Sequence, residues 1–159
     1  MVDLYEMPGH LVRRLHQIST ALFGTRMAEA GIDLTSVQFA ALVAVRESPG
    51  IDQATLAGLI AYDRVTIGGV VDRLLAKGLV TREVSPRDRR ARVLELSDAG
   101  QALLERAMPV AVAVQGDILE GLPVGERDGF VALLRKATEA GNDHSRAPLV
   151  PLARAEPAE

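Results

Sequence analysis

The spacing of apolar residues changes at Gly78, and this change constrains the fold more than any other feature of the sequence. Before it, residues 51–60 and 64–77 repeat apolar side chains every three or four positions, which predicts two short helices. Asp52 and Asp63 stand where these helices would begin, and short carboxylate side chains often cap helix N-termini. Only a tight turn fits between the two segments, so this part of the chain predicts a helix-turn-helix.

After Gly78 the sequence alternates between apolar and polar residues, as expected of β-strands. Two segments follow this pattern, residues 79–84 and 92–96. The residues between them, 85–91, carry too many charges to be buried and predict the turn of a hairpin. A hairpin directly after a helix-turn-helix makes a winged helix. The expected fold class is therefore mainly α with a small β-hairpin wing.

Longer helical patterns flank this unit on both sides. Apolar spacing predicts further helices over 8–30, from Thr35 to a break at 48–50, from Ser97 towards Ile118, and over 124–140. The last residues contain three prolines among alanines and charged residues, a composition that predicts disorder. We therefore divide the chain into an N-terminal helical segment (1–34), a winged helix-turn-helix lobe (35–97), C-terminal helices (98–141) and a disordered tail (142–159).

Composition excludes several classes of protein. The chain of 159 residues has the size of one domain, and it contains no cysteine, which excludes disulfides, thiolate zinc sites and catalytic thiols. Its longest stretch without a charged residue, 34–45, is too short to cross a bilayer, and its N-terminus lacks the basic region of a signal peptide. We expect a cytoplasmic protein without a membrane partner, a metal or another cofactor. No spacing typical of a catalytic triad, a metal site or a phosphate loop is present, so we expect no enzyme.

Charge is distributed unevenly along the chain. The net charge is -3, yet residues 62–92 hold eight Lys and Arg against four Asp and Glu. The other 128 residues hold ten basic and seventeen acidic side chains. A basic segment inside an acidic chain indicates a polyanionic partner, and its position in the winged helix indicates double-stranded DNA.

The second helix of the helix-turn-helix supplies candidate contacts to base edges in the major groove. The hydrogen-bonding or small residues near its N-terminal end are Arg64, Thr66, Gly68, Gly69 and Arg73, whereas Val65 is expected to face inward. The two adjacent glycines lower helix propensity, so they indicate close approach to DNA or to another helix, or alternatively relief of packing. Gln53 and Thr55, at the start of the preceding helix, are candidate phosphate contacts.

The predicted hairpin turn is a second candidate DNA contact. It carries Arg87, Arg89, Arg90 and Arg92, and arginine at a hairpin tip can enter a narrow minor groove. We expect Asp88 to hold one of these guanidinium groups by a charge-assisted hydrogen bond. The alternative is a solvated, charged turn without a partner.

These segments together resemble the MarR (multiple-antibiotic-resistance regulator) family. The resemblance is carried by Asp52-Gln-Ala-Thr-Leu-Ala57, by Asp63-Arg-Val-Thr-Ile67, by 71–80, and by Asp88-Arg-Arg90 followed by the pattern Leu96-Ser-x-x-Gly100. It implies a homodimer whose N- and C-terminal helices intertwine and dimerise, and which binds a palindromic operator. It also implies that Arg90 enters the minor groove and that Asp88 orients it. The departures are Val65, where a small polar residue is common, and the Gly68-Gly69 pair.

The first helix carries a resemblance of its own. Residues 8–17 are similar to the first helix of MarR members that sense aromatic catabolic acids or their thioesters. This similarity implies a ligand site for a small aromatic carboxylate, with candidate residues His10, Arg13, Arg14 and His16 and, on the second helix, Ser36 and Phe39. An arginine can pair a carboxylate, and a histidine can hydrogen-bond a phenol or a carboxylate.

The sequence therefore predicts a ligand-responsive DNA-binding transcriptional regulator. We expect a homodimeric repressor that a small aromatic acid or its thioester releases from its operator. The alternative hypothesis is a winged-helix protein-interaction module that does not bind DNA sequence-specifically.

Overall fold

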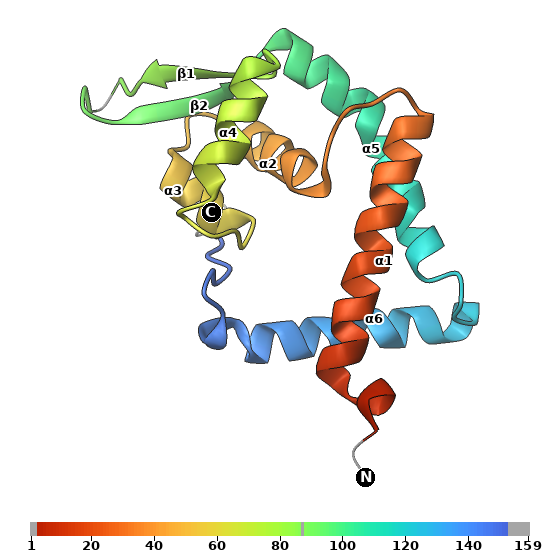
Figure 1. Cartoon of the computed structure of the whole chain (residues 1–159). Helices are drawn as coiled ribbons and strands as arrows, with labels where there is room; N and C mark the ends of the chain where they lie inside the picture. The colour runs from red at the N-terminus through yellow and green to blue at the C-terminus, as the bar shows by residue number, and fades with distance from the viewer. Residues whose placement is uncertain (1–2, 87, 153–159) are drawn as a thin grey trace, which may run out of the picture.

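The computed structural model of the chain describes residues 3–86 and 88–152. This part of the chain is mainly helical with one antiparallel pair of strands. In chain order the elements are η1 (Leu4–Glu6), α1 (Pro8–Glu29), α2 (Ser36–Glu47), α3 (Gln53–Leu59), α4 (Ile67–Ala76), β1 (Val80–Val84), β2 (Arg92–Leu96), α5 (Asp98–Ile118), α6 (Val124–Ala140) and η2 (Asn142–His144). Figure 1 shows α1 and α5 on one side of the molecule and the lobe of α2, α3, α4 and the hairpin on the other.

The lobe is the predicted winged helix-turn-helix. Strands β1 and β2 pair antiparallel from Val80 opposite Leu96 to Val84 opposite Arg92, so the hairpin extends outward from the helices. Its core is aliphatic, because the sequence has few aromatic residues. The largest fully buried side chains of the lobe are Leu42, Val45, Leu56, Ile67, Val71 and Leu74. The fold class expected from the sequence is confirmed.

Helix α4 begins later than the sequence predicts. Residues 64–66 form a turn, and the helix starts at Ile67. The Asp63 carboxylate accepts a hydrogen bond from the backbone N–H of Val65, at 2.7 Å, instead of capping a helix that begins at residue 64. The Asp63 carbonyl then accepts from the N–H groups of Thr66 and Ile67. An aspartate side chain commonly bonds its own backbone two residues on, and here that local turn delays the helix.

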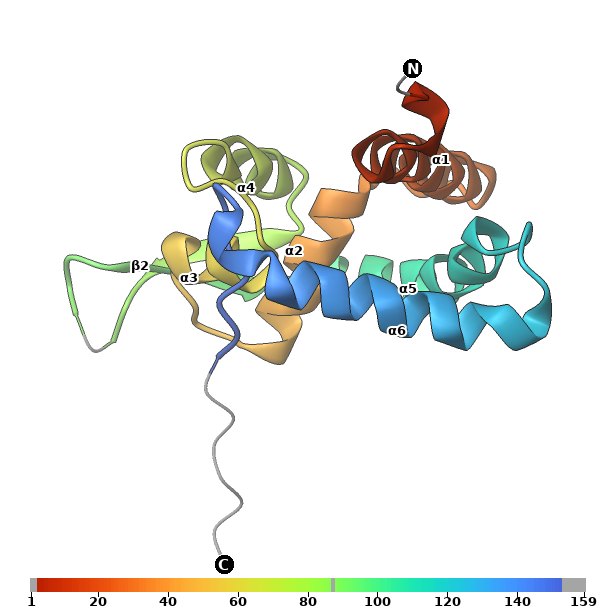
Figure 2. The same cartoon turned by 90° about the horizontal axis from the view of Figure 1, so that it is seen from below.

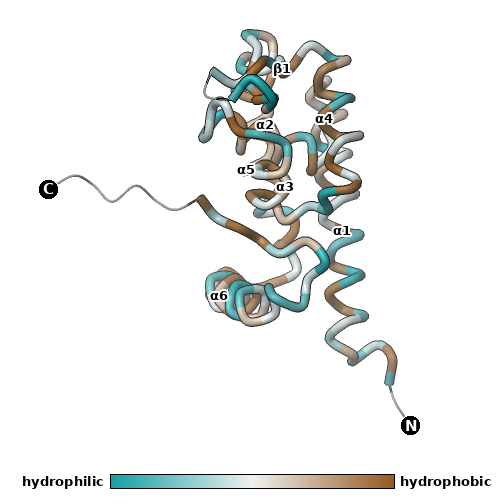
Figure 3. The backbone as a smooth tube through the Cα atoms, turned by 90° about the vertical axis from the view of Figure 1, so that its left-hand side faces the viewer, coloured by the Kyte–Doolittle hydropathy of each residue, from teal (hydrophilic) through white to brown (hydrophobic). Residues whose placement is uncertain are grey.

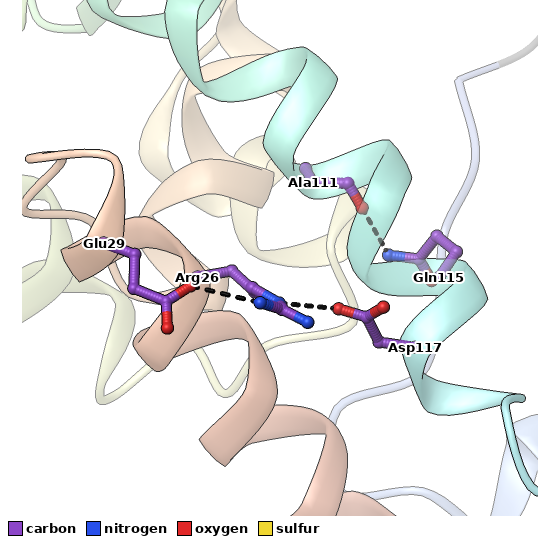
Figure 4. A network of polar contacts seen from close by, with 5 residues as sticks. All are labelled: Arg26, Glu29, Ala111, Gln115 and Asp117. Atoms are coloured by element: carbon purple, nitrogen blue, oxygen red, sulfur yellow. Dashed lines mark hydrogen bonds and ion pairs between the residues drawn. The ribbon is translucent and has the colours of Figure 1, made fainter.

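Helices α1 and α5 pack along each other through a row of apolar residues. The buried members are Phe23 and Met27 on α1 and Leu104, Ala107, Ala111 and Val114 on α5. At the edge of this seam Arg26 donates to Asp117, at 2.7 Å, and to Glu29, at 3.2 Å (Figure 4). The hydrogen bond to Asp117, followed by that to Glu29, raises the pKa of the Arg26 guanidinium above its ordinary value. These contacts connect the last turns of α1 and α5.

Helix α6 turns back from the end of α5 and leads the chain towards α3 (Figures 1 and 2). None of its residues is buried. No helix of the described residues is both long and apolar enough to span a membrane.

The structure differs from the predicted disordered tail over residues 142–152. This stretch forms η2 and then an extended segment that contacts α3, and Figure 3 shows its last part as hydrophobic. The apolar residues Leu149, Val150 and Leu152 alternate with prolines, which stiffen the backbone and lower the entropic cost of docking. Residues 153–159 lie outside the described part of the chain.

The N-terminus of α2 has a capping box, which leads to a testable prediction. Thr35 Oγ1 accepts from the N–H of Gln38, and the Gln38 side chain accepts from the N–H of Thr35. Thr35→Ala should lower the free energy of unfolding by about 1 kcal/mol, because one backbone donor loses its partner. Urea denaturation measures this change. The matched control is Ser36→Ala, since the exposed Ser36 side chain makes no hydrogen bond to a described residue; equal losses in both variants would contradict the capping role.

Candidate functional site

The exposed side of α4 forms one part of the candidate DNA-binding surface. The helix buries Ile67, Val70, Val71 and Leu74 against the lobe. Thr66, Gly69 and Arg73 are exposed, and their spacing of three and four places them on one face. Arg64 is exposed in the turn before the helix. This face therefore presents two arginines, a hydroxyl and a bare backbone position.

The two adjacent glycines of α4 have different surroundings. A Cβ atom on Gly68 would lie 3.4 Å from Nε2 of Gln53, so Gly68 faces α3. A Cβ atom on Gly69 would meet no atom within 4 Å, so Gly69 faces open space. Of the alternatives that the sequence left open, helix packing fits Gly68, and Gly69 remains free for close approach of a partner.

Val65 does not face inward as expected. Val65 is 90% exposed, more than any other large apolar residue of the described chain. The reason is the late start of α4: Val65 belongs to the turn held by Asp63 and not to the apolar face of the helix. It therefore lies between Arg64 and Thr66 on the candidate DNA-binding surface.

The start of α3 is tied to the wing by an arginine that sequence reasoning missed. Nη2 of Arg82, on β1, donates to Oε1 of Gln53 at 3.3 Å and lies 3.5 Å from Oδ1 of Asp72 on α4. Arg82 thus connects α3, α4 and the hairpin. Thr55 donates its hydroxyl hydrogen to Oδ2 of Asp52, at 3.0 Å. A single arginine at an outward-facing strand position was the only sequence signal for this bridge, and strand arginines are usually solvated.

The wing presents its arginines to solvent. Arg89, Arg90 and Arg92 are exposed and make no ion pair with a described residue, whereas Arg87 lies outside the described residues. Asp88 makes no ion pair with Arg89, Arg90 or Arg92, and a pair with Arg87 would lie outside the described residues, so the expected guanidinium contact stays a prediction. Its Oδ1 accepts from the backbone N–H of Arg90, at 2.9 Å, and its carbonyl accepts from Ala91. Asp88 therefore shapes the turn, and this leaves the Arg90 guanidinium free.

Two of the candidate ligand residues of α1, His10 and Arg13, form a cluster with Gln17 and Tyr5. Arg13 Nη1 donates to Gln17 at 3.1 Å, and its Nη2 lies 3.4 Å from Nδ1 of His10, whose ring packs edge-on against Tyr5. Arg14 and His16 are exposed on the same helix.

The structure does not bring the α2 candidates to this cluster. Ser36 is exposed, and the Phe39 ring packs on Phe23, with 5.7 Å between ring centroids. Phe39 also lines an apolar hollow of about 570 Å³ between α2 and α3, together with Ala40, Val43, Leu59, Ile60 and Leu152.

Comparison with known proteins decides the family. The MarR family model matches residues 32–91, the lobe just described. The transcriptional repressor NicR of Pseudomonas putida is 38% identical over 138 residues, which cover 87% of this chain and 86% of NicR. The chain belongs to the MarR family. It is accordingly a DNA-binding transcriptional regulator and not an enzyme, as the sequence predicts.

Solved structures agree with this assignment. The PcaV regulator of Streptomyces coelicolor, solved with its natural ligand, has a TM-score of 0.78 and 34% identity, covering 89% of this MarR chain and 98% of PcaV. BpsR of Bordetella bronchiseptica, whose DNA binding is regulated by 6-hydroxynicotinic acid, has a TM-score of 0.80 and 32% identity, covering 87% and 98% of the two chains.

Proposed function

We propose that this MarR protein is a homodimeric repressor that binds a palindromic operator and is released by a small aromatic acid or its thioester. The observation that carries the DNA-binding part is the combination of two features: three exposed wing arginines, Arg89, Arg90 and Arg92, that make no ion pair with a described residue, and an exposed polar face of α4. Since its relatives are regulators of bacterial genes, we further infer that it acts in the cytoplasm, where bacterial DNA lies.

We assign DNA contacts according to the exposed positions. Arg64, Thr66, Gly69 and Arg73 face the major groove, and Arg90 enters the minor groove from the wing, with Arg89 and Arg92 on phosphates. Gln53 acts by positioning, because its amide oxygen is engaged by Arg82. In a two-fold dimer the two α4 helices lie about one helical turn of DNA apart, roughly 34–36 Å.

Dimerisation is supported by apolar side chains that one chain leaves exposed. Most of the exposed large apolar residues of the described chain lie near the N-terminus and on the α1, α5 and α6 helices: Leu4, Tyr5, Met7, Leu11, Val12, Ile18, Val112, Val124, Val131, Leu133 and Leu134. A hollow of about 380 Å³ between α1 and α6 is also lined mainly by apolar residues. Large apolar side chains exposed together on a few helices are typical of a protein interface. Segments 1–34 and 98–141 are therefore the proposed dimerisation elements.

Sedimentation equilibrium should give twice the chain mass; a monomer at micromolar concentration would contradict the proposal.

The ligand part of the proposal rests on the α1 cluster. Arg13 and His10 offer a cation and a ring nitrogen next to an aromatic ring, which together suit an aromatic carboxylate. PcaV and BpsR, which are regulators with small ligands, support this class of effector. Release then follows from a population shift, since a ligand that binds one dimer geometry better increases its share. A nearly complete switch requires a preference of about 5.5 kcal/mol.

The double variant Arg13→Gln, His10→Ala tests the ligand site. DNA affinity should stay unchanged, because both residues lie on α1, away from α4 and the wing. The concentration of aromatic acid needed for half-release should rise at least about tenfold, since one charge-assisted hydrogen bond is lost in each protomer. A gel-shift titration of the upstream intergenic DNA with a panel that includes 6-hydroxynicotinic acid measures both quantities. Lys136→Gln on α6 is the charge-matched control, and unchanged release in the double variant would place the pocket elsewhere.

A further inference from the structure

The chain after α6 returns to the DNA-binding lobe as an extended segment, residues 145–152, which we call the C-terminal strap (Figures 1 and 2). Its base is fixed by Asn142, whose amide nitrogen donates to the Leu149 carbonyl at 3.1 Å and whose amide oxygen accepts from the Leu149 N–H at 2.8 Å. The amide of Asn142 therefore closes the intervening residues into a compact loop. This loop sets where the rest of the strap meets the lobe.

The strap docks on α3 at a glycine. The N–H of Val150 donates to the carbonyl of Gly58 at 2.9 Å. A Cβ atom on Gly58 would lie 3.2 Å from Cβ of Val150, so the strap approaches α3 as closely as a residue without a side chain allows. Farther along, Leu152 covers the apolar hollow between α2 and α3. A backbone hydrogen bond, a close approach and an apolar contact thus hold the strap on the lobe.

This docking places one cation beside the candidate DNA-binding surface. Arg146 borders a hollow of about 390 Å³ that Asp63, Arg64 and Val65 also line. Arg146 is exposed and makes no ion pair with a described residue. The nearby Asp63 carboxylate is engaged by the N–H of Val65. Arg146 is the only charged residue of the strap sequence, so the strap adds one positive charge next to Arg64 and no negative charge.

We propose that the C-terminal strap is a third DNA-contacting element, in which Arg146 binds a backbone phosphate next to the turn 64–66. The inference rests on the proposed DNA-binding function and extends it to a segment outside the helix-turn-helix and the wing. Arg64 and Arg146 border one hollow and make no ion pair with a described residue, so both guanidinium groups can offer positive charge to the phosphate backbone. A strap that blocked DNA by imitating it would need acidic residues, and residues 145–152 contain none.

The salt dependence of DNA binding tests this contact directly. Each phosphate contact contributes about 0.9 to the slope of log K against log salt concentration. Arg146→Gln should therefore reduce the slope by about 1.8 for a dimer and weaken binding about tenfold at physiological salt. Arg135→Gln on α6 removes the same charge from an exposed position that does not border the hollow shared by Arg64 and Arg146, and it should leave the slope unchanged.

A second variant displaces the strap without touching its arginine. Gly58→Leu inserts a side chain where Val150 packs, and α3 itself is not weakened because leucine has a higher helix propensity than glycine. Gly58→Leu should reduce the slope as much as Arg146→Gln does. The double variant Gly58→Leu, Arg146→Gln should show no further loss, because both changes remove the same contact with DNA. Circular dichroism confirms that each variant is folded.

The outcomes separate this inference from the proposed function. If the unaltered chain binds the selected duplex and Arg146→Gln keeps the full slope, the strap contact is wrong and the regulator remains. Tighter binding by Gly58→Leu would also overturn the inference, because it would show that the strap competes with DNA. If the unaltered chain shows no specific DNA binding, the proposed function itself fails.

Discussion

Replacing Arg90 by alanine is expected to weaken binding to the operator about a hundredfold and to leave the dimer intact. The guanidinium of Arg90 is exposed and makes no ion pair with a described residue, so its removal costs the fold no contact that the structure shows. In the complex with DNA, the Arg90→Ala variant would lose a charge-assisted hydrogen bond of about 1.5 kcal/mol in each protomer. Over the two wings of the dimer, this loss of binding free energy corresponds to about a hundredfold in affinity. Fluorescence anisotropy with a labelled operator measures the affinity, and sedimentation measures the dimer.

Two companion variants make the Arg90 result specific. Arg90→Lys keeps the charge but loses the planar fork, so it should recover only part of the affinity. Asp88→Asn keeps an oxygen that can accept from the Arg90 N–H, and it should therefore retain most of the binding. If Asp88→Asn were as damaging as Arg90→Ala, the carboxylate charge would act on DNA or on an arginine, contrary to the turn-shaping role. Loss of the dimer in Arg90→Ala would contradict the wing assignment.

Replacing Gly100 by alanine is expected to lower the free energy of unfolding by about 3 kcal/mol, a large part of the stability of such a domain. Gly100 is buried in the first turn of α5, and an added Cβ atom would overlap the carbonyl oxygen and the carbonyl carbon of Leu79. The same Leu79 carbonyl accepts a hydrogen bond from the N–H of Ser97. The Ser97 hydroxyl donates to the Gly78 carbonyl and accepts from the N–H of Gly100. This junction joins α4, the hairpin and α5. Because the clash is with the backbone of Leu79 and not with a side chain, the backbone itself would have to shift to relieve it.

Gly116 is the matched control for Gly100, because it lies on the same helix and an added Cβ atom would meet no atom within 4 Å. Gly116→Ala should stabilise the protein by about 0.5 to 1 kcal/mol, since alanine restricts the unfolded chain and favours the helix. Urea denaturation of both variants at equal protein concentration gives the comparison, because the stability of a dimer depends on concentration. Equal stability of Gly100→Ala and the parent chain would show that α5 does not approach Leu79 as described.

The lobe was predictable from sequence where local chemistry determines it. Thr35, Asp52 and Ser97 each cap the helix that follows, and Gly50 and Gly78 adopt positive φ angles at the break and the helix end predicted there. Each of these signals involves residues within a few positions of one another. The change of hydrophobic spacing at Gly78 likewise required no knowledge of distant contacts.

Features that depend on distant residues were not predictable. Arg82 acquires its role only because folding brings α3 and α4 beside β1. The composition of the strap predicts a disordered tail, because its docking position at Gly58 is distant in sequence. The late start of α4 was missed for a different reason: the periodicity over 64–77 is helical throughout, and the Asp63 turn overrides it at the first positions.

Selection of bound duplexes from a random-sequence library tests whether the dimer recognises a specific DNA sequence. We expect enrichment of an inverted repeat whose half-sites are about 10 base pairs apart, bound at least about a thousandfold more tightly than random DNA at physiological salt. We also expect Arg90→Ala to lose this preference at the positions under the wing. Equal affinity for enriched and random duplexes, or enrichment of a single half-site without a repeat, would contradict a dimeric, sequence-specific regulator.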